Sequence, residues 1–310
     1  MPSTTRRTRP GSRRLRAYAT VALAAALGAV FRLLPWTAAQ AAGSALGRLG
    51  WHLSRRDRRR ILDHLALAFP ELAAAERERL GRSSYRHLGI VAGEFLWLLR
   101  RSCRYLAPHV RVEGWEVVEG LRARGRPILF VTGHCGNWEL LGAAANCRGA
   151  DVTYVARALD ELPLQRFLAA FRSRFAGRTI ERGGAGAARE MLQALRRRGG
   201  LAILIDQDTR VEGVWVPFFG RPAFTPVGAA RLALKRDVAV VPVFDERLPD
   251  GSHLAHFEPP LELPGDEVEA TAMMTRAIEA QVRRVPEQWV WMHRRWRRQP
   301  GSEESSASEI

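Results

Sequence analysis

Strand-like and helix-like segments alternate along the second half of this 310-residue chain. Short apolar runs occupy 128–132, 152–156, 179–180, 201–205 and 238–244, and segments of helical periodicity separate them at 138–146, 164–175 and 187–198. This alternation predicts an α/β fold with a mostly parallel central sheet flanked by helices. Such sheets carry functional side chains on the loops at the carboxyl ends of their strands, so candidate site residues are expected there.

One strand end combines a histidine with a carboxylate. His134 follows the strand 128–132, and Glu139 comes five positions later, at the start of the next helix. On one continuous helix the two side chains would point about 140° apart, so they can pair only if His134 lies in the loop and Glu139 in the first helical turn. Gly136 and Asn137 favour such a turn. A carboxylate on one ring nitrogen would leave the other free to act as a general base. A structural histidine beside a helix-capping glutamate is the alternative.

Two further strand ends carry polar side chains. Arg157 follows the strand 152–156, and Asp206, Gln207 and Asp208 follow the strand 201–205. We expect them to converge with His134 on one edge of the sheet. Two aspartates could bind Mg²⁺, although turn-forming or substrate-positioning roles fit them better. Because the chain shows no additional histidine–carboxylate cluster at ligand spacing, no metal site is expected.

Composition and charge suggest five segments. Residues 1–16 are arginine-rich and expected to be disordered; 17–53 contain an apolar run that ends near Phe31; 54–108 have helical periodicity; 109–298 form the α/β domain; and 299–310 are a polar tail expected to be disordered. The apolar run is shorter than the roughly 20 residues that span a bilayer. It fits a cleaved signal peptide, a single spanning helix or an interfacial helix, and a retained membrane anchor is favoured over cleavage.

The net charge of +16 comes almost entirely from arginine, because Lys235 is the only lysine. Arginine binds phosphate and carboxylate groups bidentately, so the surface should attract acidic partners. The three cysteines, Cys103, Cys135 and Cys147, show no paired spacing. They are therefore expected to be reduced thiols that face the cytoplasm.

The chain closes with an aromatic and arginine-rich block, Pro286 to Arg298, which includes Arg294. This composition suits a lipid headgroup interface and equally single-stranded nucleic acid. In order, the segments GHCGNWE, ILIDQD, VPFFG, VVPVF and PEQWVWMHRRWRR resemble the lipid A biosynthesis late acyltransferases (lauroyl/myristoyl type), a family of the lysophospholipid acyltransferase superfamily. The resemblance extends from about Leu46 to Arg298. One departure concerns the residues after Arg157, where the family usually carries an asparagine.

The resemblance implies an O-acyltransferase that moves a fatty acyl chain from acyl carrier protein, or from coenzyme A, to a hydroxyl of a phosphorylated membrane lipid. A lipid A precursor is the expected acceptor. His134 would be the general base and Glu139 its orienting carboxylate, without a cofactor or a covalent enzyme intermediate. The expected substrate-binding residues are Arg157, Gly136, Asn137, Asp206, Gln207, Asp208 and Arg294. The enzyme is expected on the cytoplasmic face of the inner membrane, as a monotopic or single-pass protein without a nucleic-acid partner.

Three alternatives remain open. The acceptor could be another membrane lipid, such as mannosylated phosphatidylinositol or a glycerophospholipid. A metal-dependent hydrolase would use His134 with the aspartates of 206–208. A non-enzymatic membrane- or nucleic-acid-binding protein would explain the arginines, but it would leave the spacing of His134 and Glu139 unexplained.

Overall fold

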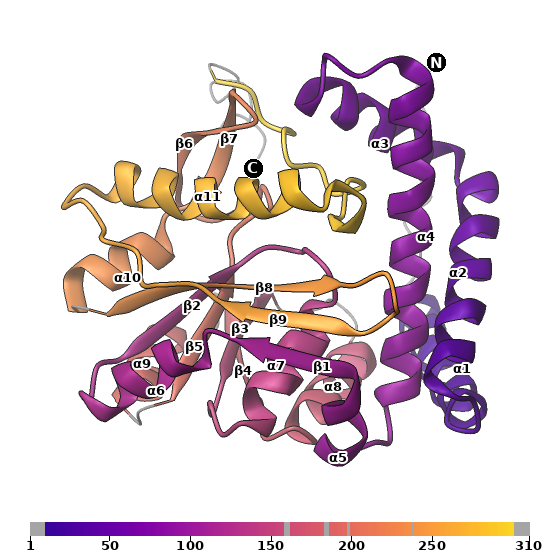
Figure 1. The fold of residues 1–310 in the computed structure, drawn as a ribbon, viewed down its shortest axis with the longest axis horizontal. Helices are drawn as coiled ribbons and strands as arrows, with labels where there is room; N and C mark the ends of the chain where they lie inside the picture. Colours follow the sequence, from indigo (N-terminus) through magenta and orange to yellow (C-terminus); the bar gives the residue numbers. More distant parts are fainter. Residues whose placement is uncertain (1–9, 158–161, 183–185, 197–198, 237, 301–310) are drawn as a thin grey trace.

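The computed structural model describes residues 10–157, 162–182, 186–196, 199–236 and 238–300. Four helices come first and form a layer beside the sheet: α1 (Pro10–Phe31), α2 (Trp36–Leu53), α3 (Arg55–Ala68) and α4 (Ala74–Leu98) (Figure 1). Helices α2 and α4 lie side by side and approach closely at two glycines. A Cβ atom on Gly43 would collide with the backbone carbonyl of Gly89, so glycine is required for this packing.

Helix α1 begins at Pro10, inside the segment 1–16 that was expected to be disordered, so that prediction is wrong for residues 10–16. Helical propensity extends backwards from the alanine-rich run and includes Arg13, Arg14 and Arg16. Residues 1–9 and 301–310 lie outside the described residues. Among the described helices, none combines the length and apolarity that crossing a bilayer requires.

The central sheet has seven strands in the order β1-β9-β8-β2-β5-β3-β4. Strands β8, β2, β5, β3 and β4 run parallel, and β9 pairs antiparallel with β8 and parallel with β1. The mostly parallel sheet is therefore confirmed. The bounds of the strands are β1 Val110–Glu113, β2 Ile128–Thr132, β3 Thr153–Arg157, β4 Arg178–Arg182, β5 Gly200–Leu204, β8 Ala239–Arg247 and β9 His253–Phe257.

Both faces of the sheet are covered, which explains why β2 is buried along its whole length. Leu129 and Val131 belong to the core beneath α9, α10 and α11, whereas Ile128 and Phe130 belong to the core beneath α6 and α7. Their alternation follows the two-residue period of a strand. The helices are α5 Cys103–Leu106, α6 Trp115–Ala123, α7 Trp138–Cys147, α8 Leu162–Ser173, α9 Ala187–Arg196, α10 Gly228–Arg236 and α11 Glu267–Arg284, with single 3-10 turns at Ala107–His109 and Pro286–Gln288.

Two strands outside the central sheet, β6 (Gly213–Phe218) and β7 (Arg221–Pro226), form an antiparallel hairpin (Figure 1). The hairpin packs against α11 and contributes Phe218 to the main core. The sequence pattern did not predict this hairpin, because its strands do not show the apolar alternation that marks a strand.

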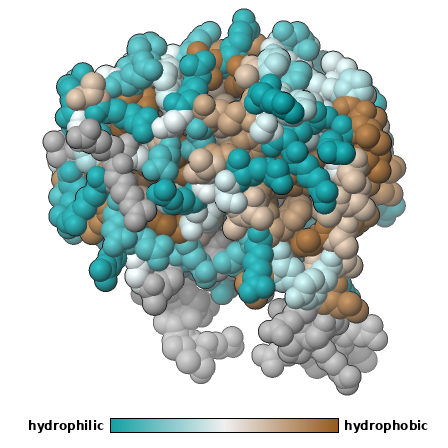
Figure 2. Space-filling view, turned by 90° about the horizontal axis from the view of Figure 1, so that it is seen from below, coloured by the Kyte–Doolittle hydropathy of each residue, from teal (hydrophilic) through white to brown (hydrophobic). Residues whose placement is uncertain are grey.

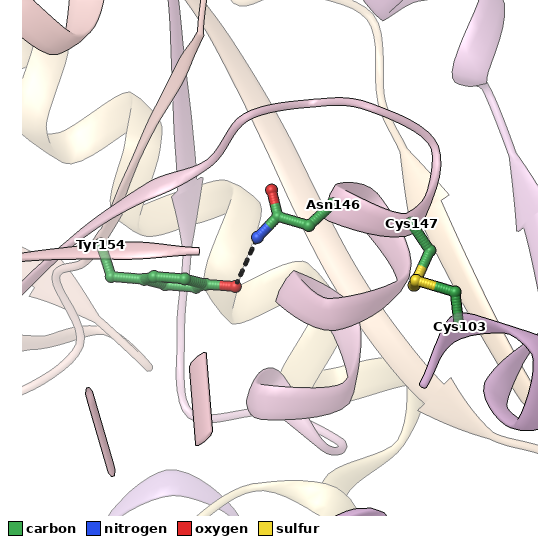
Figure 3. The surroundings of a disulfide bond; sticks show 4 residues. All are labelled: Cys103, Asn146, Cys147 and Tyr154. Carbon is green, nitrogen blue, oxygen red and sulfur yellow. Dashed lines mark hydrogen bonds between the residues drawn. A yellow bond between two sulfur atoms is a disulfide. The ribbon is translucent and has the colours of Figure 1, made fainter. Parts of the chain in front are cut away.

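Cys103 and Cys147 form a disulfide that joins α5 to the end of α7 (Figure 3). The expectation of three reduced thiols is therefore wrong for this pair, and Cys135 is free and buried. The two cysteines are 44 positions apart, and the packing of α5 against α7 brings them together. Their spacing alone could not reveal this contact. Next to the disulfide, the Asn146 amide donates a hydrogen bond of 3.4 Å to the hydroxyl of Tyr154 (Figure 3).

Candidate active site

The sheet register places a histidine beside an aspartate. Thr132 at the end of β2 pairs with Leu204 at the end of the neighbouring parallel strand β5. His134 and Asp206 each follow two residues later, and Nδ1 of His134 lies 2.7 Å from Oδ1 of Asp206. The predicted convergence of these two strand ends is therefore confirmed. It results from parallel pairing, which places equivalent positions of the two strands side by side.

Asp206 is buried, and both of its carboxylate oxygens accept hydrogen bonds. Its Oδ2 accepts hydrogen bonds from the backbone amide of His134 at 2.7 Å and from the indole nitrogen of Trp289 at 2.8 Å. Burial would raise the pKa of the Asp206 carboxyl, but the electrostatic influence of His134 and the hydrogen bonds from its ring and its backbone amide outweigh burial and hold the pKa well below its usual range. Asp206 is therefore a carboxylate, and His134 donates to it from Nδ1, which leaves Nε2 as the basic nitrogen.

Glu139 has a different partner. Its two oxygens accept hydrogen bonds from Nε and Nη2 of Arg172 at 3.0 and 2.6 Å, a bidentate ion pair between α7 and α8. The prediction that Glu139 orients His134 is therefore corrected, because Asp206 occupies that position. The sequence argument considered only the nearest carboxylate along the chain, whereas strand pairing brought in one 72 positions away.

The loop that carries His134 has the predicted form. His134 lies outside α7, which begins at Trp138, and Glu139 lies in its first turn. Asn137 caps the helix, because its side-chain oxygen accepts a hydrogen bond from the amide of Leu140 at 3.1 Å. The prediction of a histidine in the loop and a glutamate in the helix is confirmed, although their pairing is not.

A second histidine completes the polar cluster. Nε2 of Gln207 lies 3.1 Å from Nε2 of His134 and 2.8 Å from Nδ1 of His293. The rings of His134 and His293 are perpendicular, with centroids 4.7 Å apart. Burial, and then the electrostatic influence of neighbouring His134, lower the pKa of His293 to about 4. His293 is therefore neutral at physiological pH.

A cavity of about 1370 Å³ opens beside this cluster. Its polar wall includes His134, Glu139, Arg172, Gln207 and Asp208. Its apolar wall includes residues of α7 and the sheet: Phe130, Leu141, Gly142, Ala145, Val152, Ala202, Val243 and Phe257. A histidine in the polar wall and an extended apolar wall suit a substrate with a polar group and a hydrocarbon chain.

The other predicted site residues lie in several places. Gly136 and Asn137 form the back of the His134 loop and are not among the cavity residues. Asp208 lines the cavity and binds the backbone amide of Arg298 at 3.0 Å. Arg294 is exposed and outside the cavity. The backbone of Arg157 ends β3, but its side chain is outside the described residues.

Comparison with known proteins identifies the family. Residues 8–298 match the family model described as bacterial lipid A biosynthesis acyltransferase. The chain belongs to this family. The resemblance noted in the motifs is thereby confirmed, and with it the classification of this chain as an O-acyltransferase.

Among its curated relatives are two acyltransferases from Escherichia coli (strain K12). The lipid A biosynthesis palmitoleoyltransferase is 28% identical over 285 residues, which cover 88% of this chain and 89% of the relative. The lipid A biosynthesis lauroyltransferase is 28% identical over 277 residues, which cover 86% and 88%. A phosphatidylinositol mannoside acyltransferase from Mycobacterium tuberculosis (strain ATCC 25618 / H37Rv) is 28% identical over 133 residues, which cover 42% of each chain.

In this member of the lipid A acyltransferase family, three residues of the site were not predicted from the sequence. Arg172 gave no signal, because it is one of many arginines in amphipathic helices. Trp289 and His293 belong to the closing block, whose aromatic character suggested a lipid or nucleic-acid surface. The structure instead buries Trp289 and places the block against His134. A tryptophan and histidine at the end of a folded domain could have suggested this role.

Proposed function

We propose that this protein transfers a fatty acyl chain from an acyl thioester to a hydroxyl of a membrane lipid, with a lipid A precursor as acceptor and His134 as general base. The observation that carries the proposal is the pairing of His134 with buried Asp206 at the polar end of a cavity with an apolar wall. The lipid A acyltransferases among its relatives support the acceptor class. Acyl carrier protein or coenzyme A is the proposed donor.

The reaction follows from the protonation state of His134. Nε2 accepts the proton of the acceptor hydroxyl as its oxygen attacks the carbonyl carbon of the thioester. Asp206 stabilises the imidazolium that results, and the tetrahedral intermediate then collapses to the new ester and the thiolate of the donor. The imidazolium returns its proton to that thiolate, so His134 regains its starting state. Gln207, which lies 3.1 Å from Nε2, would be displaced by the acceptor hydroxyl.

Direct transfer is supported by the state of the cysteine next to His134. Burial, followed by the charges of Asp206 and Asp245, raises the pKa of the Cys135 thiol well above its usual value. A buried neutral thiol is a poor nucleophile. A covalent acyl–cysteine intermediate is therefore disfavoured.

Glu139 retains a proposed role through Arg172. Both lie in the cavity wall, and Glu139 binds Nε and Nη2 of Arg172, so the orientation of the guanidinium is fixed. Nη1 of Arg172, which is not part of this ion pair, would donate to an anionic or carbonyl oxygen of substrate. Arg210 and Arg297 are exposed cations in the same wall and suit the phosphates of a lipid A precursor or of the donor.

Membrane contact is proposed for α1 and α2. Exposed apolar side chains follow the outer surface of these helices, and Figure 2 shows hydrophobic surface on the side where they lie. The side chains are Leu15, Tyr18, Leu23, Leu27, Val30, Leu46, Leu49 and Leu53, together with Leu33 in the turn between the helices. An interfacial helix buries such a face among lipid headgroups, so a monotopic enzyme on the inner membrane is the proposed arrangement. Helix α1 also contacts α8, which contributes to the cavity wall.

The decisive experiment offers purified enzyme and its His134→Ala variant an acyl thioester with two acceptors, a lipid A precursor and a mannosylated phosphatidylinositol. Mass spectrometry should show one added acyl chain on the lipid A precursor with the wild type and none with the variant. Transfer to the mannosylated phosphatidylinositol alone would refute the lipid A precursor as acceptor and would favour the substrate class of the mycobacterial relative. Full activity of His134→Ala would refute the proposed base.

A further inference from the structure

A buried ionic cluster lies behind the loop that carries His134. It consists of Glu94 from α4, Asp245 and Arg247 from β8, and His253 from the start of β9. The side chains of Glu94, Asp245 and His253 are fully buried, and that of Arg247 is nearly so. The cluster is not part of the cavity wall at His134. Burying charges is costly unless each is paired and hydrogen-bonded, so the arrangement of the cluster requires an explanation.

His253 is held between two carboxylates. Its Nδ1 lies 2.8 Å from Oδ2 of Asp245, and its Nε2 lies 3.1 Å from Oε1 of Glu94. A carboxylate can only accept, so both ring nitrogens must carry hydrogen and His253 is an imidazolium. Burial alone would lower the pKa of His253, but the charges of Asp245 and Glu94 outweigh it and raise the pKa to about 9. The cluster thus balances two negative charges with two positive ones.

The same carboxylates hold the catalytic loop. Oδ2 of Asp245 accepts a hydrogen bond from the backbone amide of Asn137 at 2.7 Å, and Oε2 of Glu94 accepts one from its side-chain amide at 2.9 Å. Asn137 is three residues after His134 and caps α7. Gly136 touches the cluster as well, because a Cβ atom there would collide with the carbonyl oxygen of Asp245.

A neutral histidine adds one more contact. Nη1 of Arg247 lies 2.6 Å from Nδ1 of His87, which must therefore accept, so Nε2 of His87 carries hydrogen and donates to the carbonyl of Gly136 at 3.2 Å. Burial and the charge of Arg247 keep the pKa of His87 well below its usual value. Gly136 also donates from its amide to the carbonyl of Gln288 at 2.9 Å.

We infer that His253, as an imidazolium, is a positioning residue: it pairs with Asp245 and Glu94 and holds both carboxylates in place, and they fix the backbone between His134 and α7. Without its positive charge, two buried carboxylates would lie close together with one cation, and either protonation or movement of a carboxylate would weaken its bonds to Asn137. A displacement of about 1 Å in a catalytic group can lower the rate about 100-fold. This inference rests on the proposed role of His134.

The groups that face His253 come from every neighbouring element. Glu94 and neutral His87 lie on α4, and Asp245 and Arg247 lie on β8. On α2, the ring of Trp36 lies 5.9 Å from the ring of His253. In the 3-10 turn Ala107–His109, burial and then the charge of His253 lower the pKa of His109. Trp36 is uncharged and burial lowers the pKa of His109, so Asp245 and Glu94 dominate the titration of His253.

The test uses His253→Gln, Asp245→Asn and the double variant Asp245→Asn/His253→Gln in the full-length enzyme. The single variant leaves the carboxylates unbalanced, so kcat should fall about 10- to 100-fold at unchanged KM, with circular dichroism showing a folded protein. The double variant removes one charge of each sign, and the asparagine oxygen can still accept from Asn137. It should recover most of the lost kcat, which a double-mutant cycle measures.

A kcat of His253→Gln equal to that of the wild type would overturn the inference. The inference would also fail if the kcat of the double variant were no higher than the value expected from multiplying the effects of the two single substitutions. A wild-type enzyme that acylates neither lipid acceptor would refute the proposed function instead. If His253→Gln does not fold, the wild-type pH profile decides. A raised-pKa histidine stabilises its surroundings below its unfolded pKa near 6.5 and loses that effect as pH rises through about 9. The kcat should therefore fall as the pH rises through about 9, while circular dichroism stays constant. A kcat that does not change as the pH rises through this value would refute the positioning role.

Discussion

The carboxylate of Asp206 lies 2.7 Å from Nδ1 of His134, and each residue stands two positions beyond the paired ends of β5 and β2. Parallel register, rather than proximity along the chain, therefore gives His134 its carboxylate partner. Glu139, the nearer acid in sequence, is bound to Arg172. The two carboxylates therefore have different partners, and substitutions can test their roles separately.

Asp206→Asn should abolish most of the activity. An amide cannot stabilise the imidazolium and favours the wrong tautomer of His134, so kcat should fall by about 10³- to 10⁴-fold. Steady-state acyl-transfer assays measure this change. Asp208→Asn is the comparison, because Asp208 is equally buried but binds Arg298 rather than His134. A similar loss in both variants would contradict a specific role for Asp206.

Glu139 and Arg172 should behave as one unit. Removing either partner leaves the other charge largely buried without its bidentate partner, so Glu139→Gln and Arg172→Met should each reduce kcat/KM. The double variant should lose little beyond the worse single variant, because the interaction is already gone. Kinetics of the three variants measure the coupling. Additive losses would show that Glu139 acts independently, for example directly on substrate.

Chain-length preference should depend on the apolar wall. Ala145 lies seven residues after Trp138 on α7, a rise of about 10 Å, so it faces the part of the cavity distant from His134. Ala145→Leu should shorten the preferred acyl donor. A series of acyl thioesters measures this preference, with exposed Ala170→Leu on α8 as control. An unchanged preference in Ala145→Leu would place the acyl chain elsewhere.

Acid should destabilise the fold through buried histidines. Burial, and then nearby positive charge, lower the pKa values of His293 and His256 to about 4. The unfolded chain therefore binds more protons between about pH 6.5 and 4, and stability falls as pH decreases through that range. Thermal melts across this range should show a falling Tm. His256→Gln, outside the active site, should flatten the slope; an unaltered slope would argue that His256 titrates normally.

The disulfide should contribute to stability more than to catalysis. It closes a loop of 44 residues and joins α5 to the end of α7 opposite the one near His134. Cys103→Ser should lower the free energy of unfolding by about 2–4 kcal/mol, because the unfolded chain gains conformational freedom. Urea titration measures the loss, and kcat below the transition should remain close to that of the wild type. A reductant should lower the free energy of unfolding of the wild type but not that of Cys103→Ser.

The sequence determined the alternating architecture and the position of His134. The apolar runs at 128–132 and 201–205 correspond to β2 and β5. A continuous short apolar run is typical of a strand in a parallel sheet that helices cover on both faces. The five-residue spacing from His134 to Glu139 required a loop followed by a helix, and α7 begins at Trp138. These features are local, so periodicity and turn chemistry were sufficient to predict them.

Only the tertiary structure decided which groups meet. Asp206 reaches His134 through strand register, Arg172 reaches Glu139 through the packing of α8 on α7, and Cys103 reaches Cys147 through the position of α5. The cluster around His253 is likewise assembled from helices and strands more than 150 positions apart. Pairings of this kind depend on which of many similar side chains the packed fold brings within hydrogen-bonding distance, and no local pattern along the chain encodes that choice.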